Sequence, residues 1–143
     1  IILRFEIEQM LFNDEIKPAE LADVWNAKVH EYLGIEVPDH ATGVLQDVHW
    51  SEGLFGYFPT YALGTIISAQ IWERIQRDVP DLDARIAAGE FDGLRGWLVE
   101  HLHRHGRKFT PKETVQMVAG GPIDPEPYLR YLNGKVTSLY GAA

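Results

Sequence analysis

The stretch that most constrains the fold is "PTYALGTIISAQIWERIQRD", residues 59–78. Pro59 suits the first position of a helix, because its fixed φ is already helical. The first half of this helix is apolar nearly all round, which predicts burial on several sides. Small residues, such as Gly64 and Ala69, would let neighbouring helices approach closely. The chain therefore needs other helices packed around this one.

The rest of the chain also has apolar residues at helical spacing. Further helices are expected over residues 1–12, 18–33, 81–88, 92–105, 111–119 and 124–139. Asp92 and Asp124 are candidate caps, and "TPKE" at 110–113 is a capping box. No convincing strand is visible. The sequence predicts an all-α fold, an irregular bundle of about seven helices with one long aromatic loop over residues 35–58.

The beginning of the chain suggests that it continues a longer protein. Ile1 is not a methionine, and apolar residues at helical spacing start at Leu3 without a capping residue before them. We therefore expect residues 1–143 to form a single helical segment of a larger protein.

Composition excludes several classes of partner. The 143 residues carry a formal charge of −8, which argues against binding to nucleic acid or to an anionic membrane surface. The absence of cysteine rules out disulfides and thiolate metal sites, and it fits a reducing compartment. No signal peptide is visible, and the longest apolar run is too short to span a bilayer.

The loop "GVLQDVHWSEGLFGYFPTYALG" contains the first candidate site. If "QDVHW" is extended, Asp47 and His49 share one face, and the carboxylate can fix the imidazole tautomer. Such a histidine suits binding a substrate carboxylate or a developing oxyanion, with hydroxyl donors from Tyr57 and Tyr61. The alternative is purely structural: Asp47 caps a turn, His49 is a packed histidine and Trp50 belongs to the core.

A second candidate is "EHLHRHG", in which His101 and His105 are four residues apart. That spacing can present two ligands to zinc from one helix. The metallopeptidase pattern H-E-x-x-H needs glutamate after the first histidine, but Leu102 is there. We interpret the pair as a solvated last turn, where cationic groups favour the helix dipole. Other charged residues are interpreted as solvated helix faces, among them Glu6, Glu8, Arg74 and Arg77.

"GVLQDVHW" resembles the G-x-x-Q-D-x-H-W signature of the carboxypeptidase Taq family of metallocarboxypeptidases. The matching residues are Gly43, Gln46, Asp47, His49 and Trp50. The flanking "LRFEIE", "VWNAKVHEYLGI", "FGYFPTYALG" and "DPEPYLRYL" are also similar, in order, to the end of those enzymes. The resemblance covers essentially the whole chain, but it is to the C-terminal segment only.

The resemblance implies an all-helical, cytoplasmic and usually dimeric enzyme that removes C-terminal amino acids from peptides with zinc or cobalt. The family's H-E-x-x-H helix lies upstream of such a segment, so no metal is expected to bind this chain, which would be inactive alone. By analogy this chain would provide a wall of the peptide cleft, and the missing N-terminal part would be its partner. The implied catalytic residues are His49, Tyr57 and Tyr61, with Asp47 orienting His49, and the implied substrate-binding residues are Gln46, Asp47 and Trp50.

Two other hypotheses remain open at this point. The chain could be a non-catalytic helical interaction module that binds a partner through the aromatic loop. It could also be a small metal-binding protein that uses His101 and His105.

Overall fold

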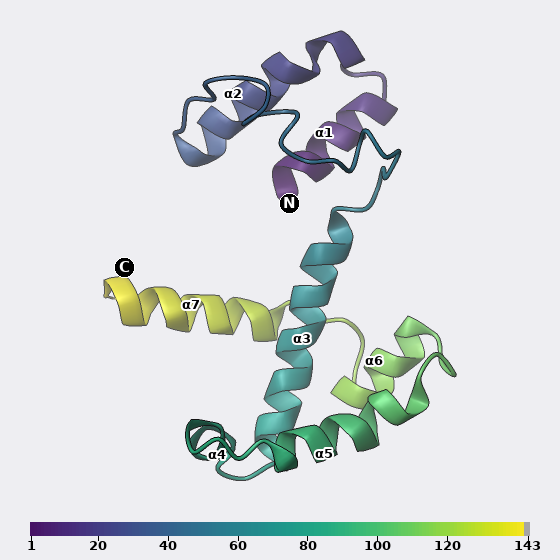
Figure 1. Ribbon diagram of the computed structural model, residues 1–143, viewed down its shortest axis with the longest axis vertical. Coiled ribbons are helices and arrows are strands. Elements are labelled where there is room, and N and C mark those ends of the chain that lie inside the picture. Colours follow the sequence, from purple (N-terminus) through teal and green to yellow (C-terminus); the bar gives the residue numbers. More distant parts are fainter. Residues whose placement is uncertain (142–143) are drawn as a thin grey trace. The chain divides into compact units, whose positions relative to one another are not determined.

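The computed structural model describes residues 1–141. It divides the chain into two compact units, Ile1–Ala62 and Leu63–Ala143, which are described separately. Over the described residues, the regular structure consists of seven α-helices and two short 3₁₀ helices, with no strand (Figure 1). The predicted all-α class is therefore confirmed. None of the helices in this part of the chain is long and apolar enough to cross a lipid bilayer.

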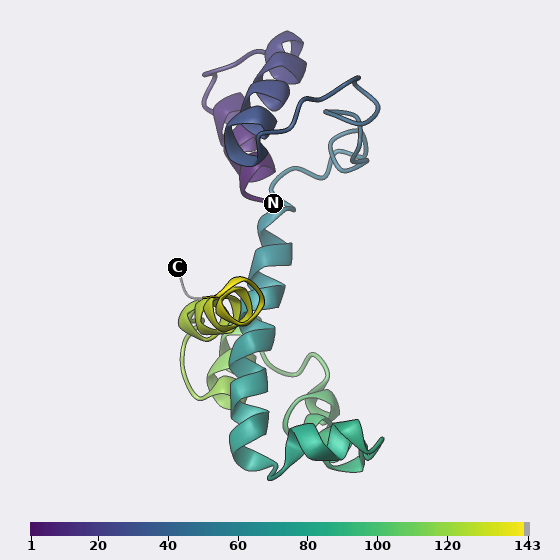
Figure 2. The ribbon, with the colours of Figure 1, turned by 90° about the vertical axis from the view of Figure 1, so that its left-hand side faces the viewer.

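The first unit is built on two helices, α1 (Ile2–Phe12) and α2 (Leu21–Leu33). A 3₁₀ turn, η1 (Pro18–Glu20), leads into α2, and Gly34 ends it in the left-handed conformation with φ of 65°. Both helices are visible at the purple and blue end of the chain in Figure 2. Their apolar faces meet in a core formed by Leu3, Ile7 and Trp25.

Residues 34–58 contain turns and bends but no regular element, as the sequence predicts for the aromatic loop. The loop is nevertheless packed against the α1–α2 core. Val37, Val44 and Trp50 are partly buried there. These contacts hold the loop in one conformation, since it has no repeating backbone hydrogen bonds of its own.

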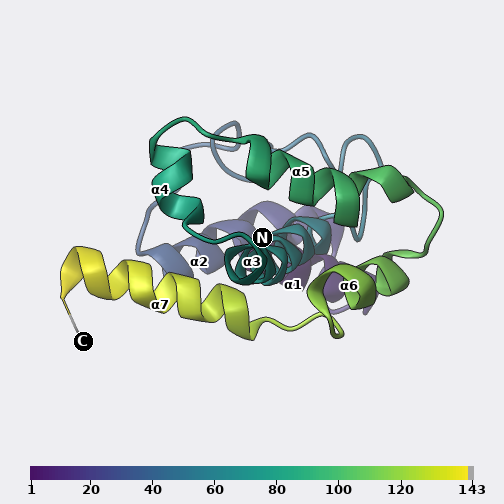
Figure 3. The ribbon, with the colours of Figure 1, turned by 90° about the horizontal axis from the view of Figure 1, so that it is seen from below.

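The second unit contains most of α3 (Pro59–Asp78), whose first four residues belong to the first unit. The other helices are α4 (Leu82–Ala87), α5 (Asp92–His101), η2 (His103–His105), α6 (Pro111–Ala119) and α7 (Glu126–Tyr140). Seen along α3 in Figure 3, α5 and α7 lie on different sides of it. The core consists of Ile75, Val79, Leu82, Trp97 and Val118.

Three details of the second unit differ from the sequence prediction. The apolar first half of α3 is half-buried or exposed, because the helices of this unit cover mainly its second half, where Gln70 and Ile75 are buried. Asp92 is the first residue of α5 and does not cap it with its side chain. The α-helix ends at His101 instead of near residue 105, because Leu102 leaves the helical region and a 3₁₀ turn comes next.

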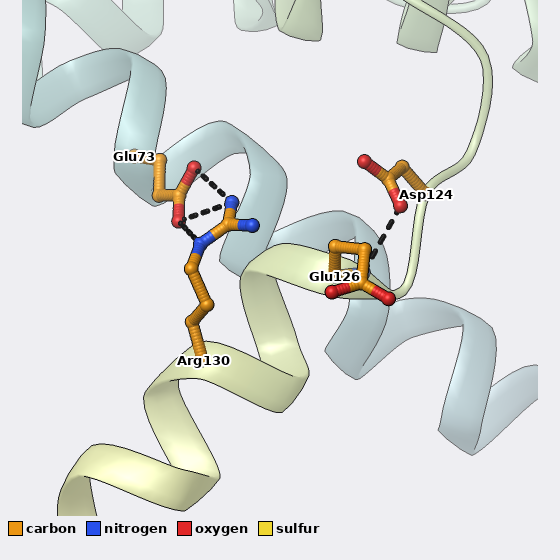
Figure 4. A network of polar contacts seen from close by, with 4 residues as sticks. All are labelled: Glu73, Asp124, Glu126 and Arg130. Carbon is orange, nitrogen blue, oxygen red and sulfur yellow. Dashed lines mark hydrogen bonds and ion pairs between the residues drawn. The ribbon is translucent and has the colours of Figure 1, made fainter.

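The connection between α6 and α7 is held by side chains of α3. Gln70 donates to the Pro122 carbonyl at 2.9 Å and accepts from the Asp124 backbone N–H at 3.0 Å. Asp124 in turn accepts from the N–H of Glu126, the first residue of α7, at 3.0 Å (Figure 4). The N-cap of α7 is nevertheless Pro125, one residue later than the predicted cap at Asp124. Beside it, Arg130 of α7 makes a forked ion pair with Glu73 of α3, with N–O distances of 2.9–3.1 Å.

Candidate functional site

The segment around His49 is folded into turns, so an extended "QDVHW", the condition for Asp47 and His49 to share one face, is not met. The backbone N–H of Glu52 donates to the Val48 carbonyl at 3.0 Å, and that of Leu54 donates to the His49 carbonyl at 2.8 Å. Such bonds between residues near in sequence cannot form in an extended strand. The alternation that would place Asp47 and His49 on one face is therefore lost.

His49 instead faces the start of α3. Its Nε2 lies 2.9 Å from the hydroxyl oxygen of Tyr61, within hydrogen-bond distance. Which atom donates depends on the imidazole tautomer. The other ring nitrogen, Nδ1, is buried and has no hydrogen-bond partner among residues 1–141. The side chain thus has one ring nitrogen against the Tyr61 hydroxyl and the other buried without a partner among the described residues.

Three aromatic rings surround the imidazole. Phe58, which is buried, lies with its ring centroid 4.6 Å from that of His49. The ring of Tyr57 is 5.6 Å away, and Tyr57 and Tyr61 meet edge to face at 5.5 Å. Tyr57 is 41% exposed and Tyr61 is 45% exposed, so both predicted tyrosines reach the surface beside His49. The three predicted catalytic residues are therefore brought together within the first unit.

Asp47 is directed elsewhere. Its carboxylate accepts a hydrogen bond from Nε of Arg4 on α1, in a part-buried ion pair. The partner of Asp47 in the structure is thus Arg4, and the partner of His49 is Tyr61. Gln46 is exposed on the same turn, and its N–H donates to the Gly43 carbonyl at 3.0 Å.

Trp50 is packed inward against the edge of Trp25, with ring centroids 6.0 Å apart. Its indole N–H donates to Glu8 of α1 at 2.9 Å. Glu8 is only 3% exposed, so the prediction that it lies on a solvated helix face is wrong. Glu6 is also engaged, by Lys28 at 2.7 Å and by the Tyr32 hydroxyl.

These two bonds lower the pKa of the Glu6 carboxyl, the Lys28 bond having the larger effect. The same bond raises the pKa of Lys28. Both shifts favour the ion pair that joins α1 to α2.

The histidines at the end of α5 do not share one α-helix, because the helix ends between them. The imidazole of His101 lies against Trp97, with ring centroids 4.5 Å apart, and that of His105 lies 5.5 Å from Phe109. Over residues 1–141, no group of three or more histidine, aspartate or glutamate side chains is arranged to hold a metal ion. The described residues therefore do not fit a resident metal.

The sequence and the helical fold match one family of enzymes. Residues 1–136 match the family model of the carboxypeptidase Taq (M32) metallopeptidases, so the chain belongs to that family. The resemblance predicted from the "GVLQDVHW" stretch is thus confirmed.

Individual relatives show the same similarity. The chain is 40% identical over 135 residues to thermostable carboxypeptidase 1 of Pyrococcus furiosus, covering 94% of this chain and 27% of the relative. It is 40% identical over 140 residues to carboxypeptidase 1 of Bacillus subtilis, covering 98% of this chain and 28% of the relative.

The fold is shared as well. The crystal structure of the M32 carboxypeptidase from Deinococcus radiodurans R1 superimposes with a TM-score of 0.93 at 39% identity, over 99% of this chain and 29% of that chain. This chain therefore spans between a quarter and a third of the length of the relatives it matches.

Proposed function

We propose that this chain forms one wall of the peptide-binding cleft of a metal-dependent carboxypeptidase and is inactive alone. Membership of the family supports the reaction class, which is hydrolysis of the last peptide bond of a peptide with release of its C-terminal amino acid. The small share of the relatives that the chain spans supports its role as a part of such an enzyme. The missing N-terminal part of the enzyme would then be its first partner.

The observation that carries this proposal is the 2.9 Å contact between His49 and Tyr61, beside a second surface tyrosine, Tyr57. A peptide entering such a cleft presents a terminal carboxylate, and its scissile carbonyl develops negative charge during hydrolysis. Both accept hydrogen bonds from imidazole or phenol donors, and donors fixed in advance stabilise the transition state most. His49, Tyr57 and Tyr61 are the proposed catalytic residues.

The other predicted residues would shape the wall. Gln46 and Asp47 lie on the turn that precedes His49, and Asp47 is neutralised by Arg4. Trp50 supports the turn from within through its ring contacts. We propose that Gln46, Asp47 and Trp50 contribute to substrate binding because they form and support the turn that carries His49.

The metal, zinc or cobalt, would be held by residues in the part of the full-length enzyme that this chain does not span. Its chemistry in such enzymes is activation of a water molecule. We also propose a cytoplasmic, homodimeric enzyme, in keeping with the resemblance and with a chain that lacks cysteine.

The test is His49→Ala in the full-length carboxypeptidase that contains this segment. Loss of a preorganised donor typically lowers kcat by about a hundredfold to a thousandfold, so we expect a fall of that order in kcat/KM. The thermal midpoint should move little. Tyr61→Phe, which keeps the ring and removes the hydroxyl, should lower kcat/KM in the same direction.

The matched control is His40→Ala, on an exposed residue of the same loop. It should leave the peptide kinetics unchanged. If His49→Ala and Tyr61→Phe also leave kcat/KM unchanged, the aromatic loop has no part in the reaction. The segment would then be better described as an interaction module.

A further inference from the structure

Glu8 is an unusual residue for its place in the chain. It lies in the middle of α1 and is 3% exposed, although neither Lys nor Arg is its hydrogen-bond partner in any bond that the structure shows. Burying a carboxylate is expensive unless hydrogen bonds replace its hydration. A glutamate retained there must therefore be bound by well-placed donors.

Both donors come from the aromatic loop. Oε1 accepts from the indole N–H of Trp50 at 2.9 Å, and Oε2 accepts from the backbone N–H of Gly56 at 3.1 Å. Trp50 is the residue directly after His49, and Gly56 directly precedes Tyr57. One carboxylate thus fixes both ends of the turn that separates His49 from Tyr57.

Gly56 is suited to this contact by its backbone. Its φ is 71°, a conformation that residues with a side chain rarely adopt. A Cβ built at this position would meet nothing within 4 Å, so space is not the constraint. The left-handed conformation at residue 56 accompanies the hydrogen bond from its N–H to Glu8.

Arg4, one helical turn before Glu8, provides a second anchor. It binds Asp47, and its guanidinium carbon lies 5.5 Å from the ring centroid of Phe58. Phe58 in turn is the ring closest to His49 in the aromatic cluster. Arg4 therefore contacts the loop at two places: at Asp47, which precedes His49, and at Phe58, which packs against the His49 ring.

We infer that Glu8 is a positioning residue, which holds His49 and Tyr57 in the geometry of the site through Trp50 and Gly56. The inference rests on the proposed function where catalysis is concerned, but its structural part can be tested on the 143-residue chain itself. The competing explanation is that Glu8 only stabilises the fold. The two explanations differ in what happens to His49 in a folded variant.

The first variant is Glu8→Gln, which keeps the size of the side chain. Glutamine has one acceptor oxygen and one NH₂ donor, so it can satisfy only one of the two N–H groups. Its NH₂ group would meet the other donor, and we expect the turn to shift. Trp50→Phe removes the indole donor, so in the double variant the glutamine oxygen can accept from Gly56 without a donor–donor conflict.

The readout on the chain is ¹⁵N NMR of the histidine rings, which reports the tautomer and titration of His49, together with urea unfolding. We expect Glu8→Gln to move the His49 signals in the folded chain, and the double variant to return them toward wild type. Glu6→Gln is the matched control, since it makes the same change two residues away on α1. It should leave the His49 signals in place.

In the full-length enzyme, Glu8→Gln should lower kcat/KM by about tenfold to a hundredfold, as expected for a misplacement of about 1 Å. The loss should appear in kcat more than in KM, and the double variant should recover part of it. If Glu8→Gln lowers the unfolding free energy but leaves the His49 signals and kcat unchanged, the residue is structural and the inference is overturned.

The outcomes also separate this inference from the proposed function. If His49→Ala leaves the kinetics unchanged while Glu8→Gln still moves the His49 signals, the proposed function fails and the positioning role stands. If His49→Ala abolishes activity while Glu8→Gln moves nothing, only the positioning role fails. If Glu8→Gln does not fold, Glu8→Asp tests the same bonds, because its carboxylate is one methylene too short to reach both Trp50 and Gly56, and it must then move the His49 signals.

Discussion

At the residue scale, Asp78 shows how one carboxylate joins two helices of the second unit. It accepts from Nε of Arg74, one turn earlier on α3, at 2.8 Å and from the indole N–H of Trp97 on α5 at 3.0 Å. These bonds, the Arg74 bond first, hold the pKa of Asp78 below its ordinary value. The charged form is therefore favoured in the folded chain.

We predict that Asp78→Asn destabilises the chain more at pH 7 than at pH 3. A carboxyl whose folded pKa is depressed contributes stability above its unfolded pKa, about 4, and loses it as the pH falls through the folded value. Urea unfolding of wild type and variant at both pH values measures the difference. An equal difference at pH 7 and pH 3 would show that the charge of Asp78 contributes nothing.

The residues whose surroundings differ from the sequence prediction have partners far away in the chain. Periodicity predicts a solvated face for Glu8, but its partners are 42 and 48 positions away. The motif pairs Asp47 with His49, whereas Asp47 binds Arg4, 43 positions away. Local periodicity carries no information about such contacts. His49, Tyr57 and Tyr61 can be selected from the sequence because their residue types and the family resemblance single them out.

At the scale of elements, α6 begins as its sequence predicts. The Thr110 hydroxyl oxygen accepts from the N–H of Glu113, and the Glu113 carboxylate accepts from the N–H of Thr110 at 2.8 Å. The bonds of Thr110 with Glu113 lower the pKa of that carboxyl. Every bond of this capping box lies within four residues, which is why the sequence alone predicts it.

We predict that Thr110→Ala lowers the free energy of unfolding by about 1 kcal/mol, the usual cost of losing an N-cap side chain. Urea unfolding monitored by far-ultraviolet circular dichroism provides the measurement. Thr110→Ser, which keeps the hydroxyl, is the control and should remain close to wild type. If alanine is tolerated as well as serine, the capping box does not stabilise α6.

The end of α5 illustrates the opposite case. Its sequence allows a helix to residue 105, yet Leu102 adopts φ of −127° and a 3₁₀ turn replaces the last α-helical turn. A 3₁₀ turn at a helix end differs little in energy from an α turn, so tertiary packing decides between them. Leu102 packs against the core of the second unit. This contact is not visible in the helical periodicity.

At the scale of the whole molecule, helix order was predictable and the division of the chain was not. The boundary between the two units falls after Ala62, inside α3, where no linker composition marks it. The apolar residues of α7 are also only partly covered. Pro127 is buried, whereas Val136 is 52% and Leu139 is 65% exposed.

We predict that the 143-residue chain self-associates through the exposed apolar residues of α7, because exposed apolar surface favours association. The weight-average sedimentation coefficient should rise with concentration. Val136→Lys with Leu139→Lys should suppress the rise, whereas Thr137→Lys with Ser138→Lys, the same added charge on neighbouring residues, should suppress it less. A monomer at every concentration would contradict the prediction.

The spacing between Arg4 and Glu8 limits how the length of α1 can change. Each residue added to a helix rotates the later residues of that helix by about 100°. A one-residue insertion or deletion between the two anchors would therefore turn one of them away from the loop while the other stayed. Exchanges of exposed side chains on α1, such as those of Ile2 and Gln9, leave both anchors in place. The first helix should accept new residues far more readily than a new length.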